Sequence, residues 1–357
     1  MTTELTQQAA PQIEQMVTAK QLQRAVADLQ TTRPGPGLLK VSICTALFLA
    51  GVSVAMTAGS VAVFTAAAVF CGLLASVMII TTHDAIHHTL TGMVWFDELF
   101  PRLMSWPILW LHSTYSEVHK VHHKMNGDDI TDPERVQWTR EEYAQASALT
   151  RFYVRHQWFF DIFVFGGFGL IVETFRNGLR YARVSKSMRR AVMTDIAGLL
   201  VVNGLIYSVA IAHGNGLRWL AFWLVLERCT GAIMQWRAHV EHYGLWGKGR
   251  HYFETQSYTC RNIQTNGFAS WFFNRLNFHS VHHAFPRVPF YLLETAHKRF
   301  LELYSQAGVE PLVEERGYVL TSLKLARQPT VIGSPDPLSA SHRRSMVSLA
   351  ELDRVLA

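Results

Sequence analysis

Long runs of apolar residues dominate the pattern along this chain. The segment 61–80, VAVFTAAAVFCGLLASVMII, contains no charged residue and has roughly the 20 residues that a helix needs to cross the hydrocarbon core of a bilayer. The apolar segment 39–56 precedes it, and only TAGS at 57–60 separates the two. This pattern predicts two transmembrane helices that form a hairpin.

The second half of the chain repeats this arrangement. Segments 195–213 and 217–234 are apolar and flank the turn Gly214-Asn215-Gly216, so a second hairpin is predicted. Glu227 and Arg228 interrupt the last segment, and ionisable groups inside a span are costly and usually face a bundle interior or a cavity. Two interpretations stay open: the pair lines a substrate channel, or the helix is shifted so that the pair lies at the interface.

Two further apolar stretches are expected not to span. Segment 95–111 is short and broken by prolines, which places it in the membrane interface. Segment 158–175 carries Asp161, Glu173 and three glycines, and is expected to be interfacial or re-entrant. The predicted fold is therefore all-α and integral to a membrane, with four transmembrane helices in two hairpins and additional interfacial helices.

The two ends of the chain are more polar than its middle. Residues 1–37 lack the charged-then-apolar pattern of a cleaved signal peptide. Within them, residues 12–29 place apolar side chains at helical spacing, which predicts an amphipathic helix on the membrane surface or on the protein; a frayed tail is the alternative. Residues 326–357 are rich in Pro and Ser and are expected to be a flexible tail. The membrane domain is then residues 38–325.

The formal net charge of +6 does not indicate a nucleic-acid-binding protein, because the basic residues are not interleaved with exposed aromatic residues on a soluble module. Six of them fall within residues 176–190, whereas both predicted hairpin turns are nearly free of Lys and Arg. By the positive-inside rule this segment and both termini face the cytoplasm. The expected location is the inner membrane of a bacterium.

Histidines gather at four places outside the predicted spans. The motifs are HDAIHH at 83–88, HKVHH at 119–123, HVEHYG at 239–244 and HSVHH at 279–283. Residues three or four apart share one helical face, so each cluster can direct several ring nitrogens at one point. Neutral imidazole is a common metal ligand. The candidate metal ligands are His83, His87, His88, His119, His122, His123, His242, His279, His282 and His283, with His239 less favoured than His242.

A shared metal site requires all four motifs to lie on one side of the membrane. An even number of crossings must therefore separate consecutive motifs, which holds if segments 95–111 and 158–175 do not span. The motifs then form a histidine-rich cap on the cytoplasmic side. The remaining histidines are scattered along the chain and are expected to have no metal role.

The three motifs HDAIHH, HKVHH and NFHSVHHAFPRVPFYLLETAHKRF resemble the histidine boxes of the membrane fatty acid desaturases. The third box of that family typically reads NYHxEHH followed by FPxxPxYxL. The resemblance covers roughly residues 40–300, in order and in spacing. Val281 departs from it, since many members carry glutamate there. The HVEHYG motif is also similar to one in the related membrane alkane hydroxylases.

This resemblance implies two iron ions held by histidines on the cytoplasmic face of four membrane helices, with O2 and two electrons consumed. Imidazoles alone would also suit Zn, Cu or Ni, so the expectation of iron rests on the resemblance. Ligating histidines usually donate their second ring N–H to an acceptor that orients the ring. The candidate acceptors are Asp84, Asp132, Glu241 and Asn277, each of which has a helix cap or a surface charge as its alternative role.

The chain lacks an electron-transfer module of its own. Cys44, Cys71 and Cys229 lie in apolar spans and Cys260 stands alone, so neither a disulfide framework nor a four-cysteine rubredoxin-like site is expected. A GxGxxG turn for a flavin or nicotinamide is also missing. A separate donor such as a ferredoxin or a rubredoxin, with its reductase, is therefore predicted to supply electrons.

These observations together predict an O2-dependent di-iron enzyme that inserts a double bond into the acyl chain of a lipid. One alternative is a membrane di-iron hydroxylase of an acyl chain, an alkane or a related lipid, because the same site can return oxygen to the substrate. The second alternative is a metal-handling membrane protein without catalysis. Product analysis separates the first two, and lipid-dependent O2 uptake separates both from the third.

Overall fold

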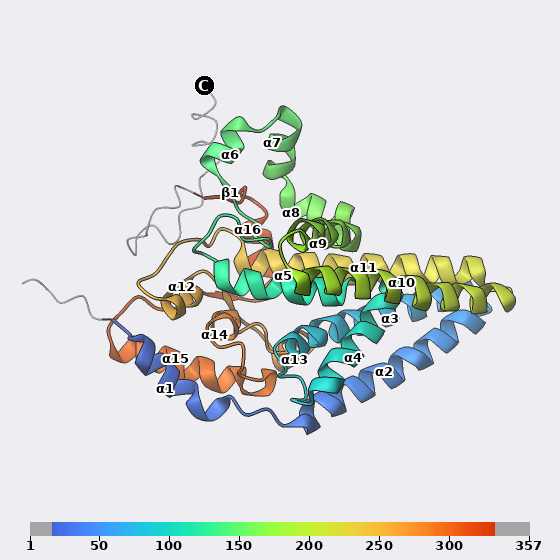
Figure 1. The fold of residues 1–357 in the computed structure, drawn as a ribbon, viewed down its shortest axis with the longest axis horizontal. Coiled ribbons are helices and arrows are strands. Elements are labelled where there is room, and N and C mark those ends of the chain that lie inside the picture. The colour runs from blue at the N-terminus through green and yellow to red at the C-terminus, as the bar shows by residue number, and fades with distance from the viewer. Residues whose placement is uncertain (1–15, 333–357) are drawn as a thin grey trace, which may run out of the picture.

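Four long helices extend to one end of the molecule, at the right in Figure 1. They are α2 (Pro34–Thr57), α3 (Val61–Ile86), α10 (Lys186–Ala212) and α11 (Gly216–His242). In this computed structural model, which describes residues 16–332, α2 packs along α3, and α3 packs along α11. The short connections between α2 and α3 and between α10 and α11 lie at the same end of the molecule. That these pairs cross a bilayer as two hairpins stays a prediction.

Among the described residues, four helical segments are long and apolar enough to span a membrane, but they are not the four that the sequence pattern predicts. They are Pro34–Thr57, Val61–Ile86, Gln157–Ala182 and Lys186–Ala212. Helix α11 is absent from this set because Arg218, Glu227 and Arg228 interrupt its apolar character. Segment 157–182 qualifies despite Asp161 and Glu173, so its composition alone does not confine it to the interface.

Segment 157–182 is nevertheless not one regular helix. It consists of α8 (Gln157–Phe159), a π-helical turn η3 (Phe160–Phe165) and α9 (Gly166–Ala182). The chain breaks at Gly166, whose φ of 51° favours glycine. In Figure 1, α9 is seen nearly end-on while α10 and α11 are seen from the side, so α9 crosses these long helices rather than running alongside them.

Glu227 and Arg228 of α11 form hydrogen bonds with the backbone on either side of this break. Arg228 donates to the carbonyls of Val164 and Phe165, both at 2.9 Å, and Glu227 accepts the N–H of Phe168 at 2.9 Å. Backbone groups freed at a helix break need such partners wherever water is excluded. The pair therefore serves mainly to satisfy the backbone of the neighbouring segment, which neither sequence interpretation foresaw.

The remaining elements gather at the opposite end of the long helices (Figure 1). The helices are α1 (Ala19–Val26), α4 (Val94–Ser105), α5 (His112–Met125), α6 (Arg140–Gln145), α7 (Ala148–Arg155), α12 (Tyr252–Tyr258), α13 (Gly267–Phe272), α14 (His279–Ala284), α15 (Leu293–Gln306) and α16 (Tyr318–Leu325), with the 3-10 turns η1 (Ala27–Leu29), η2 (Trp106–Ile108) and η4 (Phe290–Leu292). Segment 95–111 thus forms α4 and η2 and is no single long helix.

Two short pairs of parallel strands join loops that are far apart in the sequence. Strand β1 (Trp138–Thr139) pairs with β4 (Val331–Ile332), with Trp138 opposite Val331. Strand β2 (Asn262–Gln264) pairs with β3 (Glu314–Arg316). The predicted C-terminal tail therefore begins with residues that pack on the core, since Val331 is fully buried. Its positions 333–357 lie outside the described residues.

The N-terminal helix predicted over 12–29 lies on the protein. Helix α1 buries Leu22 and Val26 against α15, and Arg299 of α15 donates to the carbonyl of Ala25 at 2.7 Å. A capping box at Thr18 fixes the start of the helix. Positions 12–15 of the predicted segment lie outside the described residues.

Candidate metal centre

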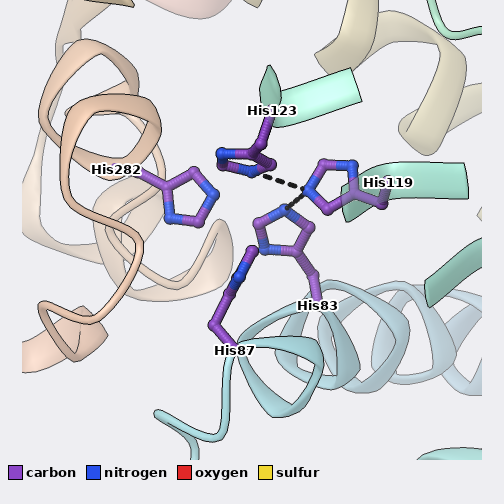
Figure 2. A group of neighbouring side chains, drawn as sticks. All are labelled: His83, His87, His119, His123 and His282. Carbon is purple, nitrogen blue, oxygen red and sulfur yellow. Dashed lines mark hydrogen bonds between the residues drawn. The ribbon is translucent and has the colours of Figure 1, made fainter. Parts of the chain in front are cut away.

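Five histidine rings from three helices converge in a first cluster (Figure 2). Helix α3 continues past its apolar part to Ile86, which places His83 and His87 about one turn apart. Helix α5 contributes His119 and His123, and α14 contributes His282. One ligand atom from each residue lies within 4.8 Å of all the others. Residues from all three motifs, HDAIHH, HKVHH and HSVHH, therefore meet at one point.

The ring nitrogens of this cluster face one another closely. The Nε2 of His119 lies 2.8 Å from that of His83 and 3.0 Å from that of His123. The Nε2 atoms of His87 and His282 are buried without any hydrogen-bond partner. An unpaired buried polar atom costs about 1–3 kcal/mol, so this arrangement fits a cation that accepts several nitrogen lone pairs together.

A second cluster lies beside the first. It joins His242 at the end of α11, His279 and His283 of α14, and Cys260. The Nε2 atoms of His242 and His279 are 2.9 Å apart, and the Nε2 of His283 has no partner. Sequence reasoning left Cys260 as an isolated cysteine, because nothing in its spacing from His242 or His279 indicates that the fold brings them together.

His122 belongs beside the second cluster, and His88 lies outside both. The ring centroid of His122 is 5.0 Å from those of His242 and His283. His88 follows the end of α3 with a φ of 55°, and neither group of possible ligands includes it. His239 instead contacts Asp161 through Nε2 at 2.9 Å. His242, and not His239, is therefore the residue of this motif that lies in a group of possible ligands.

Polar side chains hold several of these rings through Nδ1, the nitrogen that points away from the clusters. The Nδ1 of His122 lies 2.8 Å from Asp132, one of the candidate acceptors. Glu134 contacts the Nδ1 of His119 at 3.1 Å, and Gln256 contacts that of His283 at 3.1 Å. Sequence reasoning missed these last two; for Glu134 the only signal is its position two residues after Asp132.

The other predicted acceptors behave differently. A carboxylate oxygen of Asp84 lies 3.6 Å from the Nδ1 of His83, and Asp84 also accepts a hydrogen bond from Asn274. Asn277 contacts no histidine ring: it accepts from Ser270 at 2.8 Å and donates to the carbonyl of Ile263 at 3.1 Å. It thus fixes the loop before α14. Glu241 lies on the opposite, Nε2 side of His279, at 3.4 Å.

Burial sets the protonation of most of these rings. It lowers the pKa of His87 to about 3 and holds the pKa of His119, His123 and His282 well below the usual value. His122 is the exception: burial opposes its charged form, but attraction to the Asp132 and Glu134 carboxylates outweighs this and raises its pKa to about 9. Most of the rings are therefore neutral at pH 7, the form that binds metals.

A cavity of about 740 Å³ adjoins both clusters, within the range typical of small-molecule sites. His119, His122, His242 and His279 form one part of its wall. Trp110, Leu170 and Met234 form an apolar part, and these three also line a smaller hollow between the long helices. The cavity therefore lies between the histidine clusters and this apolar hollow.

Comparison with known proteins agrees with this geometry. The family model for fatty acid desaturases matches residues 59–311, a region that contains all the histidine motifs. A curated fatty acid desaturase of Bacillus subtilis (strain 168) is 26% identical over 242 residues, which cover 64% of this chain and 65% of that protein. The match thus spans slightly less than two thirds of the relative's length. The family match extends over well more than half of the 357 residues, and the chain therefore belongs to the fatty acid desaturase family.

Proposed function

We propose that this chain is a membrane desaturase that binds two iron ions and inserts a double bond into the acyl chain of a lipid. One O2, two electrons and two protons are consumed with the two substrate hydrogens, and two water molecules are released. The observation that carries this proposal is the pair of buried histidine clusters that share a wall of one cavity: their inward Nε2 atoms either lie against one another or, at His87, His282 and His283, have no partner.

The proposed ligand sets follow the two clusters. His83, His87, His119, His123 and His282 hold the first ion. His242, His279 and His283 hold the second, joined by His122, whose ring is fixed toward them by Asp132. His88 is left out because its position after the end of α3 separates it from both groups. Iron supplies the strong oxidant that an unactivated C–H bond requires and that no side chain provides.

The chain's own residues position the acyl substrate and orient the histidine rings. The apolar wall formed by Trp110, Leu170 and Met234 accommodates the hydrocarbon beside His119 and His242. Asp132, Glu134 and Gln256 fix the orientation of three rings, which sets ligand geometry in advance. The cavity continues toward the hollow between α3, α9 and α11, so the methyl end of the acyl chain is placed there.

The electron donor is proposed to be an acidic ferredoxin-like or rubredoxin-like protein with its reductase. The basic residues of 176–190 span the end of α9 and the start of α10, and Ser187 in this segment donates to Glu117 of α5 at 2.8 Å. The basic segment therefore lies next to α5, the helix that carries the candidate ligands His119, His122 and His123. Complementary charge accelerates such encounters, and turnover at equal speed without any donor would contradict this part of the proposal.

Topology is part of the same proposal. The clusters, the basic segment and both termini are assigned to the cytoplasmic side of a bacterial inner membrane, since Lys and Arg favour that side. Residues 38–325 are assigned to the membrane domain. Cysteine labelling at Gly59 and at Asn215, compared with labelling at Ser187, tests this orientation: the two turns are expected to react from one side and Ser187 from the other.

Expression in a host with defined lipids tests the reaction. Lipids from cells with the intact chain are expected to contain an additional double bond, detected by mass spectrometry, and lipids from cells with His282→Ala are not. A product heavier by one oxygen atom, with no new double bond, would contradict desaturation. Metal binding without lipid-dependent O2 uptake would contradict an oxidase altogether.

A further inference from the structure

We propose that Glu241 is a direct carboxylate ligand of the metal ion in the second cluster. This inference rests on the proposed function and adds to the ligand set a residue that the sequence places only among the outer acceptors. Glu241 lies on α11 immediately before His242 and one turn after Arg237, so it enters the site from the same helix end as His242.

The ring nitrogen that a carboxylate contacts indicates its role: a contact at Nδ1 orients the ring, whereas a contact at Nε2 places the carboxylate where a metal ion would bind. Asp132 and Glu134 contact Nδ1 atoms, on the outer side of His122 and His119. The inward atoms are Nε2, because these are the nitrogens that meet one another across each cluster. Glu241 Oε2 lies 3.4 Å from the Nε2 of His279, and that same nitrogen is 2.9 Å from the Nε2 of His242. The carboxylate therefore faces the inside of the cluster.

The Glu241 carboxylate also lacks the donors that a buried anion requires. Its residue is fully buried, and neither oxygen accepts a hydrogen bond. Its ion-pair partner is Arg237, with Nε 3.2 Å from Oε2, and the Nη1 of Arg237 is itself buried without a partner. Buried charges are normally paired and hydrogen-bonded or bind metals. A cation between Glu241, His242 and His279 supplies the missing partner.

A carboxylate ligand would also bring the number of ligands in the second cluster closer to that in the first. The first cluster has five imidazoles, whereas the second has three together with the neighbouring His122. Imidazoles are neutral ligands, so one anionic oxygen reduces the positive charge left in the buried site, and oxygen donors suit iron as well as nitrogen donors do. Glu241 also lines the 740 Å³ cavity with His242 and His279, so it stands on the side of the second centre that a substrate approaches.

Cys260 is the competing donor, and its surroundings differ. Asn126 donates to its sulfur at 3.5 Å, and Cys260 does not line the cavity. Its sulfur therefore accepts a hydrogen bond within the protein, whereas neither Glu241 oxygen does.

Metal titration of the full-length chain in detergent tests the assignment. The chain is stripped with a chelator and titrated anaerobically with Fe2+, and iron-57 Mössbauer spectra resolve the two ions. The variants are Glu241→Gln, Glu241→Asp and Glu134→Gln, the last a matched control whose carboxylate contacts an Nδ1 atom. Glu241→Gln preserves the size of the side chain but replaces one oxygen of the anionic carboxylate with an NH2 group, which donates hydrogen bonds and does not bind metals. Glu241→Asp restores that oxygen.

The expected result is selective. Glu241→Gln weakens binding of one ion by on the order of 100-fold or more, above the effect typical of an outer acceptor, while the first ion is retained with an unchanged Mössbauer doublet. Glu241→Asp recovers the second ion in part. Binding of both ions by Glu241→Gln as in the unmodified chain would overturn the assignment, and so would loss of both ions together. If the unmodified chain itself does not bind two ions, the proposed function fails rather than this inference alone.

Discussion

Asp195, in the long helix α10, accepts the backbone N–H of Thr114 at 2.7 Å in the first turn of α5. Its other oxygen accepts the N–H of Ser113 at 3.1 Å and the indole N–H of Trp106 at 3.0 Å. A carboxylate at a helix N-terminus satisfies unpaired N–H groups and interacts favourably with the helix dipole. One buried side chain therefore fixes the helix that carries His119, His122 and His123.

Replacing this carboxylate is expected to loosen the second histidine motif. Asp195→Ala leaves buried N–H groups without partners, which costs about 1–3 kcal/mol, and is expected to lower both the melting temperature in detergent and the affinity for metal. The exposed Glu98→Ala on α4 serves as the control, since surface ion pairs contribute about 1 kcal/mol or less. Equal melting temperatures for Asp195→Ala and Glu98→Ala would refute the anchoring role.

Loss of His282 is expected to abolish the reaction. Its ring contributes a buried nitrogen to the first cluster, and no nearby side chain replaces it. His282→Ala should therefore retain the fold but produce no new lipid, whereas His213→Ala, at an exposed turn whose ring contacts only the carbonyl of Val209, should match the unmodified chain. Lipid profiles and the melting temperature of both variants check this, and a normal product profile for His282→Ala would contradict the ligand assignment.

The contact between α9 and α11 depends on two glycines. A Cβ on Gly231 would lie 1.8 Å from the backbone nitrogen of Gly167, whereas a Cβ on Gly204 of α10 meets nothing within 4 Å. Gly231→Ala is expected to force the helices apart and to destabilise the protein by about 1–3 kcal/mol. Gly204→Ala is expected to be neutral, or to stabilise by up to about 1 kcal/mol through its higher helix propensity. Similar melting temperatures for the two variants would contradict the close packing.

Acid is expected to destabilise the metal-free protein. Burial lowers the pKa of His87 to about 3 and those of His119, His123 and His282 well below 6.5, so below about pH 6.5 the unfolded chain binds protons that the folded chain does not. Stability is therefore complete above the unfolded pKa and falls as the pH drops, by at most about 1.4 kcal/mol per pH unit for each such ring.

Burial raises the pKa of the Glu134 and Glu241 carboxyls to about 8, so their protonation stabilises the folded chain until the unfolded carboxyls also bind protons, at about pH 4.5. Thermal unfolding of the metal-free chain is therefore measured at about pH 4.5 and about pH 3.5. The melting temperature is expected to be lower at the more acidic pH. An unchanged or higher melting temperature at the acidic pH would contradict the buried, neutral state of these rings.

The sequence predicts the elements that follow from local pattern. The apolar runs locate α2, α3, α10 and α11, and helical spacing correctly groups His119 with His123 and His279 with His283. Helix periodicity also indicates that α1 has a buried face. These features depend on residues close in sequence, where side-chain direction is fixed by the helix itself.

The remaining features depend on contacts between distant residues. Segment 157–182 changes direction at Gly166 because Glu227 and Arg228, some 60 positions later in the chain, satisfy the freed backbone groups. Cys260 approaches His242 because the next residue, Arg261, donates its backbone N–H to the carbonyl of Glu241 at 2.8 Å and its guanidinium to the carbonyls of Val240 and Tyr243. In the sequence, Asp195 is only the polar residue at the start of the apolar segment 195–213. Its role in capping α5 depends on the packing of α10 against that helix.

The iron content of the purified chain tests the central claim most directly. The full-length protein is expressed in iron-replete cells, purified in detergent without added metal and analysed for iron, zinc and protein. We expect two iron ions per chain, with Mössbauer signals from two nitrogen-rich sites. A chain that retains zinc alone, or that retains iron undiminished when His122 and His282 are both replaced by alanine, would contradict the two-centre account.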